Sequence, residues 1–115
     1  MTGMTRAFRD AWLQKCTDGS YTTTRGELMS PDDSTRRCCL GVAIAVGEEL
    51  KLLEPGGLPR SGDTHDELLT NKERDTLGIG YQERFASAND DNQVPEGMYY
   101  PQEVIDLIKT HPVID

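Results

Sequence analysis

The sequence predicts an α+β fold, a mainly helical single domain of four or five short helices with a small β-hairpin or strand near residues 21–29. Three observations carry this prediction. The chain has 115 residues, which is room for one domain with one core. Apolar residues recur at helical spacing in several short segments that turn residues separate. Between the first two such segments lies a stretch rich in β-branched and aromatic residues, which favours a strand.

The first helix is expected to begin after Thr5, which can cap it, and to run to about Lys15. One apolar face recurs along it at helical spacing, through Phe8, Trp12 and Cys16. Turn residues at 17–20 then end the helix. Trp12 is the single tryptophan, and we expect it to anchor the core because aromatic side chains dominate core burial.

Residues 21–29 read Tyr-Thr-Thr-Thr-Arg-Gly-Glu-Leu-Met. We expect a short strand or one arm of a hairpin here, interrupted near Gly26, because β-branched and aromatic side chains suit a pleated surface. A loop is expected over residues 31–34.

The run from Cys38 to Val46 is apolar on every side, so it is expected to lie in the middle of the protein. Its alanines and its length favour a buried helix, although the β-branched residues alternate as they would in a strand. We predict a helix whose buried part ends at residues 47–49, and the strand stays open as the alternative.

Three further helices are predicted after a loop at residues 54–63, which is dense in proline and glycine. Thr70 and Glu73 have the spacing of a capping box, which opens a short helix that ends at residues 77–78. The next helix is expected from Tyr81 to Asn89, with one apolar face formed by Tyr81, Phe85 and Ala88.

The last helix is expected to begin at Pro101, which suits a first helical position, and to stop before Pro112. Its buried stripe consists of Val104, Leu107 and Ile108. A loop is expected between this helix and the preceding one, over residues 89–97.

Charge and hydropathy exclude several classes of function. Twelve Lys and Arg residues stand against 20 Asp and Glu residues, a formal charge of −8. General nucleic-acid binding is not expected, because it needs a net positive footprint. The acidity serves solubility or offers a surface that docks on a basic protein. The longest apolar run is too short for a bilayer and the N-terminus lacks a signal-peptide core, so we expect no membrane partner and a cytoplasmic location.

The Arg36–Arg37 pair, just before the apolar run, is the candidate ligand site. A helix N-terminus attracts anions through free N–H groups and its dipole, and two guanidinium groups add forked hydrogen bonds. Gly41 would let a ligand or another backbone approach closely. Three other residues are expected to face the same place: Arg25, Tyr21 and Thr35. The alternative is that both arginines pair with nearby surface carboxylates.

Cys38 and Cys39 are candidate nucleophiles, since a thiol at a helix N-terminus beside arginines has a lowered pKa. A catalytic thiol also needs a base, and the chain offers only His65 and His111. We therefore expect both cysteines to be small buried hydrophobic side chains.

No metal or cofactor is expected. The acidic stretches at residues 63–67 and 89–92 lack the ligand spacing of known metal loops, and neither a P-loop nor a dinucleotide fingerprint is present.

Several short motifs, taken in order, resemble a group of small accessory proteins of tailed phages. The most distinctive is Cys-Cys-Leu-Gly-Val at residues 38–42; the others are Trp12, Gly19-Ser20-Tyr21, Gly26-Glu27-Leu28, Leu77-Gly78-Ile79, Ala88-Asn89-Asp90 and Glu103-Val104-Ile105. The chain departs from the group in having Ala88 before the Asn-Asp pair and a longer loop through Tyr99 and Tyr100. The resemblance implies a phage origin and brings no catalytic residues.

These observations favour a non-enzymatic phage accessory protein that binds and sequesters or inhibits a host component, above all one of anti-phage defence. Its target is an anionic nucleotide signal held at the arginine pair, or a host protein met by the acidic surface. The alternative from another class is a small cysteine-dependent hydrolase or transferase. Oligomeric state stays open, a homo-oligomer being one way for a small binder to complete its pocket.

Overall fold

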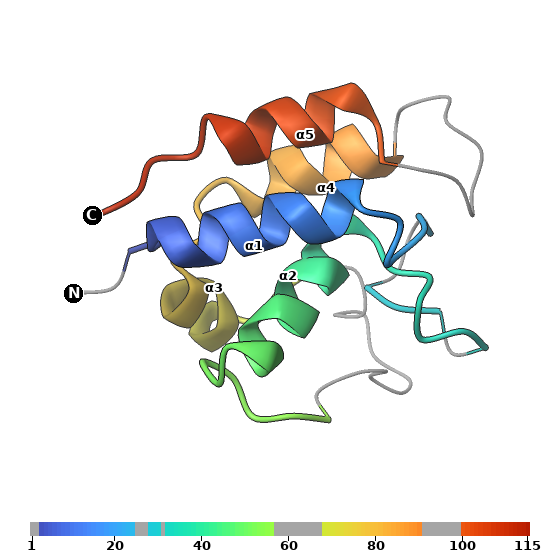
Figure 1. Cartoon of the computed structure of the whole chain (residues 1–115), viewed down its shortest axis with the longest axis horizontal. Coiled ribbons are helices and arrows are strands. Elements are labelled where there is room, and N and C mark those ends of the chain that lie inside the picture. The colour runs from blue at the N-terminus through green and yellow to red at the C-terminus, as the bar shows by residue number, and fades with distance from the viewer. Residues whose placement is uncertain (1–2, 25–27, 31, 57–67, 91–99) are drawn as a thin grey trace.

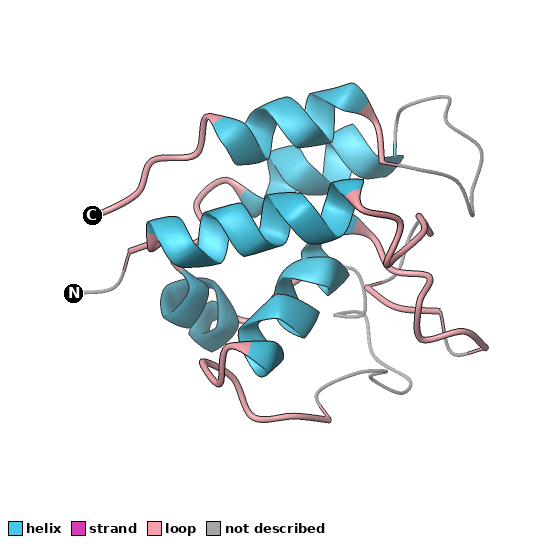
Figure 2. Ribbon diagram, in the orientation of Figure 1, coloured by secondary structure: helices cyan, strands magenta, loops and turns pink. Residues whose placement is uncertain are grey.

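The computed structural model of the chain describes residues 3–24, 28–30, 32–56, 68–90 and 100–115. Within these residues the fold is all-helical (Figure 2). Its five helices are α1 (Arg6–Thr17), α2 (Cys39–Glu49), α3 (Asn71–Leu77), α4 (Gln82–Asp90) and α5 (Gln102–Lys109).

The helices pack around α2 and α1 (Figure 1). Helix α1 lies against α2 and α5, and α4 also contacts both α2 and α5. Helix α2 contacts α3 as well, so three other helices cover it. This explains why residues 38–46 are apolar on every side: a helix surrounded by neighbours has little face left for solvent. The predicted helix is therefore confirmed over the predicted strand.

The helix ends follow the local signals in the sequence. The Thr5 hydroxyl accepts the Phe8 amide at 3.2 Å and caps α1. Thr70 and Glu73 form the predicted capping box at the start of α3. Gly78 ends α3 in the left-handed region with φ 74°, and a Cβ there would lie 2.1 Å from the Met4 nitrogen. Glycine is needed at this position for both reasons.

The predicted β-hairpin or strand near residues 21–29 is wrong for the described part of that segment, and with it the α+β class. Residues 22 and 29 make only isolated bridges, Thr22 with Arg36 in parallel and Met29 with Arg37 in antiparallel orientation. Thr23 and Thr24 are buried. Their β-branched side chains thus pack inward from an extended backbone that pairs with residues 35–37 too briefly to form a ladder.

Helix α4 begins at Gln82, one residue after the predicted start. Tyr81 has φ 56° and is 66% exposed, so it stands outside the apolar face that Phe85 and Ala88 do form. A left-handed backbone cannot continue into the helix, which sets the boundary.

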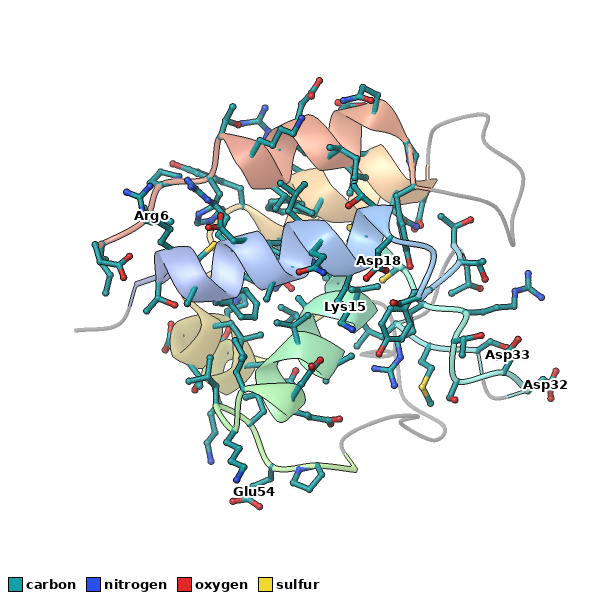
Figure 3. All side chains as sticks on the ribbon, viewed as in Figure 1. Arg6, Lys15, Asp18, Asp32, Asp33 and Glu54 are labelled. Carbon is teal, nitrogen blue, oxygen red and sulfur yellow. The ribbon has the colours of Figure 1, made fainter. Side chains whose placement is uncertain are left out.

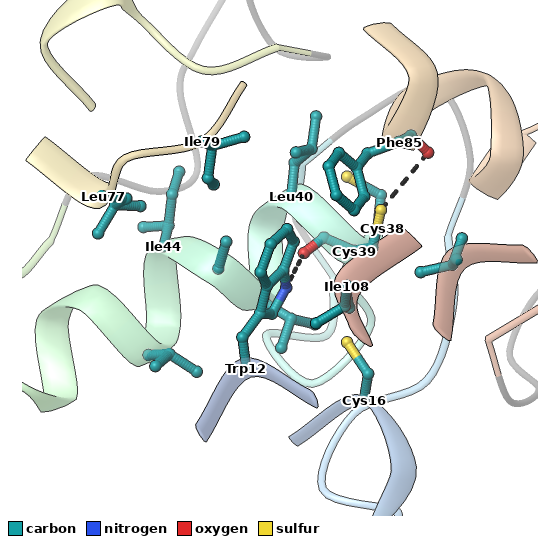
Figure 4. Packing of buried hydrophobic residues seen from close by; sticks show 14 of the residues in the cluster. Trp12, Cys16, Cys38, Cys39, Leu40, Ile44, Leu77, Ile79, Phe85 and Ile108 are labelled. Carbon is teal, nitrogen blue, oxygen red and sulfur yellow. Dashed lines mark hydrogen bonds between the residues drawn. The ribbon is translucent and has the colours of Figure 1, made fainter. Parts of the chain in front are cut away.

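Trp12 lies at the centre of the core and is fully buried (Figure 4). Its ring centroid lies 5.8 Å from that of Phe8 and 5.0 Å from that of Phe85. The predicted anchoring role of Trp12 is confirmed by this position between α1, α2 and α4.

Candidate functional site

The first residue of α2 is held by three side-chain or backbone partners from other helices. The Trp12 indole donates to the Cys39 carbonyl at 2.9 Å, and the Cys39 thiol lies 3.5 Å from the Phe85 carbonyl (Figure 4). The Cys39 amide donates to Asn89 Oδ1 at 3.2 Å. Asn89 also donates to the Thr24 carbonyl at 2.9 Å. We call Trp12, Cys39, Phe85 and Asn89 the α2 junction. It ties α1, α2 and α4 together through buried hydrogen bonds.

The N-terminus of α2 is also covered by the chain itself. The Cys38 amide donates to the Leu28 carbonyl at 3.2 Å. A Cβ on Gly41 would lie 1.8 Å from that same carbonyl oxygen. Gly41 therefore does admit a second backbone, as its position suggested, and that backbone is Leu28. The Cys38 and Cys39 N–H groups therefore donate to the Leu28 carbonyl and to Asn89 Oδ1, and they are not available to bind an anion at the start of α2.

The cysteines are buried hydrophobic residues, as predicted. Cys16, Cys38 and Cys39 are 5%, 4% and 0% exposed. Burial raises the pKa of the Cys16 and Cys39 thiols above the usual range, because the thiolate loses its hydration. A raised pKa is the opposite of what a nucleophilic thiol needs.

Both ring nitrogens of His111 already have hydrogen-bond partners within the protein, so neither is placed to act as a catalytic base. The Gly80 amide donates to His111 Nε2 at 3.1 Å, so Nδ1 carries the ring proton and donates to the Pro112 carbonyl at 2.9 Å. The ring also stacks on Phe85 with centroids 6.2 Å apart. These contacts give His111 a structural role at the end of α5. His65, the other candidate base, lies outside the described residues.

Arg37 and Tyr21 meet, and with the backbone around them they form what we call the Arg37 corner, consisting of Tyr21, Thr22, Tyr100 and residues 34–37. The Arg37 guanidinium carbon lies 5.5 Å from the centroid of the Tyr21 ring, which is within the range of a cation–π contact. Arg37 Nε donates to the Ser34 carbonyl at 2.9 Å and Nη1 to the Gly41 carbonyl at 3.1 Å. Both side chains are half-buried.

Tyr100 fastens this corner to the start of α5. Its hydroxyl lies 2.6 Å from the Arg37 carbonyl and 3.2 Å from the Thr22 carbonyl, and donates to the nearer oxygen. Burial raises the Tyr100 pKa far above its ordinary value of 10.0, since the phenolate would lose its hydration. The hydroxyl is thus kept in its protonated, donating form.

Thr35 and Arg36 form the outer side of the corner. Asp33 accepts the Thr35 amide at 2.9 Å and the Thr35 hydroxyl at 2.7 Å, and these bonds hold the Asp33 pKa below its ordinary value of 3.8. Arg36 is half-buried, and its backbone carbonyl accepts the Ser30 amide at 2.8 Å. Asp32 and Asp33 lie at the tip of the loop that carries these residues (Figure 3). Arg25, the remaining predicted site residue, lies outside the described residues.

A hollow of about 450 Å³ opens beside the corner, between the end of α1 and the start of α5. Its walls include the two tyrosines of the corner, with apolar and polar side chains from the two helices: Tyr21, Tyr100, Cys16, Ile105, Thr17 and Gln102. Its volume lies within the range typical of small-molecule sites. Of the predicted ligand residues that the structure describes, Tyr21 is the one that lines this hollow.

Sequence reasoning missed Tyr100, Gln102 and Asn89 as parts of these sites. Asn89 belonged to a motif of the phage resemblance, which was a usable signal, but nothing local links it to Cys39, 50 residues earlier in the chain. Nothing in the sequence around Tyr100 and Gln102 indicated a role at the corner or the hollow, apart from their place at the start of the last helix.

Comparisons with protein-family models, with curated proteins and with solved structures find no match to this chain. Among the described residues, no group of three or more His, Cys, Asp or Glu side chains is placed to hold a metal ion. The acidic stretch at residues 63–67, and residues 91 and 92 of the second one, lie outside the described residues. In the described part of the chain, none of the helices has the length and hydropathy that a bilayer crossing requires.

Proposed function

We propose that this chain is a non-enzymatic phage accessory protein that binds a small anionic molecule of its host at the Arg37 corner and so sequesters it. The observation that carries the proposal is the Arg37–Tyr21 stack beside a hollow of about 450 Å³. It combines a fixed positive charge, an aromatic ring and an open volume in one place. The phage origin rests on the resemblance, and an anti-phage defence signal is the ligand that such an origin favours.

Positioning of the Arg37 guanidinium supports a binding role. Nε and Nη1 donate to carbonyl oxygens of Ser34 and Gly41, which orients the planar group. A guanidinium carries five N–H donors and remains charged, so these two bonds leave it able to attract an anion. Arg36, the preceding residue, carries a second positive charge, which also helps to lower the Asp33 pKa. The two arginines stand side by side in a chain with a formal charge of −8.

Burial of the thiols weakens the enzymatic alternative. A cysteine hydrolase or transferase needs an accessible thiolate and a base. Cys39 is 0% exposed, and both ring nitrogens of His111 are bonded elsewhere. Rapid labelling of one thiol by iodoacetamide in the folded protein would revive the enzymatic alternative, whereas we expect labelling only upon unfolding.

The proposal is tested by a thermal-shift screen with mono-, di- and cyclic nucleotides. A ligand that binds only the native state stabilises it by about 2.7 kcal/mol when present at about 100 times its Kd, so a clear rise in Tm is expected. Arg36→Ala and Arg37→Ala should lose that rise. Arg84→Ala, which removes the same charge from an exposed position on α4, should keep it.

Each variant is compared with its own unliganded Tm, because Arg37→Ala also removes two hydrogen bonds and lowers stability by itself. Absence of any shift across the whole panel would contradict the small-molecule proposal. The remaining hypothesis would then be an acidic inhibitor that docks on a host protein, with association that slows at high salt.

A further inference from the structure

The hollow beside the Arg37 corner has walls of two kinds. Cys16, Tyr100 and Ile105 lie beneath it and are buried, whereas the Tyr21 ring is half-buried and is the main aromatic surface that it exposes. Thr17 and Gln102 stand at its edge from α1 and α5 and are both exposed. Ligand pockets typically combine a mainly apolar lining with a few polar groups that fix orientation. The hollow therefore suits a flat ring whose faces are apolar and whose edges form hydrogen bonds.

Tyr21 links this hollow to the positive charge. The same side chain lines the hollow and carries the Arg37 guanidinium over its ring. Stacking of a base on an aromatic side chain is a common source of affinity and tolerates any base, because each has a π-face. A molecule with a flat ring at one end and an anionic group at the other can therefore engage both parts of this region.

We infer that the hollow is a base-binding subsite, so that the ligand of the Arg37 corner is a nucleotide whose base lies against the Tyr21 ring. This inference rests on the proposed function for the anionic group, and it adds the hollow as a site of its own. Base and phosphate are then held by different residues. Their contributions to affinity can be separated by mutation.

Isothermal titration calorimetry on the full chain separates the two parts with three sets of probes: nucleosides, their 5′-monophosphates and inorganic phosphate. Gln102→Trp places a bulky ring at the edge of the hollow and should weaken nucleoside and nucleotide binding by about tenfold or more, the size of a lost base stack. Gln14→Trp, at an exposed position of α1 that does not line the hollow, is the matched control and should bind as the parent does.

A second pair of variants tests the ring itself. Tyr21→Phe keeps the aromatic face and should retain binding, whereas Tyr21→Leu should lose about tenfold or more. Circular dichroism of the unliganded variants shows that they are folded. Arg37→Ala removes the guanidinium of the proposed anion site, so it should bring nucleotide affinity down to that of the nucleoside and leave the nucleoside unaffected.

The outcomes separate the two proposals. Nucleotide binding that Arg37→Ala abolishes but Gln102→Trp leaves intact would overturn the base subsite and keep the anion site. Nucleoside binding that is lost in Gln102→Trp, with nucleotides no tighter than nucleosides, would support the subsite and overturn the anionic part of the proposed function. Binding of neither nucleosides nor nucleotides would overturn the inference. Binding of inorganic phosphate in that case would still support the anion site.

Discussion

The α2 junction and the Arg37 corner each combine an aromatic side chain with backbone carbonyl groups, but they differ in burial. Trp12 and Cys39 are 0% exposed, and their polar groups bond to buried partners from other helices. Tyr21 and Arg37 are only half-buried, next to a hollow. Arg37 and Cys39 lie only two positions apart in the chain, yet the Arg37 side chain is accessible to a ligand and Cys39 is buried in the core.

The difference in burial between the two regions indicates which side chains can contact a ligand. The residues with the most reactive side-chain type, the cysteines, serve packing, and burial raises the pKa of Cys16 and Cys39. The arginine that precedes them keeps its charge near solvent. We therefore expect mutations at the α2 junction to act on stability and mutations at the corner to act mainly on binding.

Gly41→Ala is expected to have the largest effect, because the new side chain would clash with the backbone that covers the start of α2, between the two regions. The new Cβ would lie 1.8 Å from the Leu28 carbonyl oxygen and 3.1 Å from Arg37 Cβ. The same oxygen accepts the Cys38 amide at 3.2 Å, so moving Leu28 away from α2 to make room would weaken that hydrogen bond. We expect a loss of about 3 kcal/mol, the upper part of the range for overpacking, measured by urea unfolding. Ala7→Gly, at an exposed position of α1, is the control, and its expected loss in free energy of unfolding is about 1 kcal/mol. Gly19→Ala is unsuitable as a control because Gly19 has φ 84°, which an alanine would adopt only with strain.

Asn89→Leu should break the α2 junction alone. It removes the acceptor of the Cys39 amide and the donor to the Thr24 carbonyl, and a buried polar group that loses its partner costs about 1–3 kcal/mol. Asn71→Leu, at an exposed position of α3, should change the free energy of unfolding by no more than about 0.5 kcal/mol. Equal effects of the two substitutions would show that the junction does not stabilise the fold as described.

Tyr100→Phe should loosen the corner while leaving the junction unchanged. The lost hydroxyl bonds the Arg37 carbonyl at 2.6 Å, and a hydrogen bond of this kind contributes about 1 kcal/mol. Tyr81→Phe is the matched control, because the Tyr81 side chain is 66% exposed. If both variants unfold at the same urea concentration as the parent, the hydroxyl does not hold the corner to α5.

The smallest expected effect is a dependence of the corner on pH through Asp33. Hydrogen bonds from Thr35 lower the Asp33 pKa below 3.8, so the unfolded state binds the proton more readily. The stability that Asp33 provides is therefore present above pH 3.8 and is lost as the pH falls through the lower pKa of the folded state. The difference in stability between the parent and Asp33→Ala should be small, because the carboxylate is exposed, and should vanish in acid. A difference that grows as the pH falls would contradict the assignment.

Local sequence signals predicted the helices well. Thr5, the Thr70–Glu73 capping box and Gly78 act within one helical turn, and each is found as predicted. The strand prediction was wrong for the described part of residues 21–29. β-Branched residues favour extended backbone in general, and an extended backbone becomes a strand only when a partner pairs with it over several residues. Here Thr22 and Met29 each make a single bridge.

Local patterns place the helices and bury the cysteine segment, because spacing, capping and apolar character are properties of neighbouring residues. What surrounds that segment depends on how distant parts of the chain pack together. Asn89 reaches the Cys39 amide across 50 residues and Tyr100 reaches the Arg37 carbonyl across 63. Such contacts arise when helices pack against one another, and no local pattern encodes them. The physical result is that the start of α2 is closed by the protein's own oxygens, while the arginine before it lies over an aromatic ring beside an open hollow.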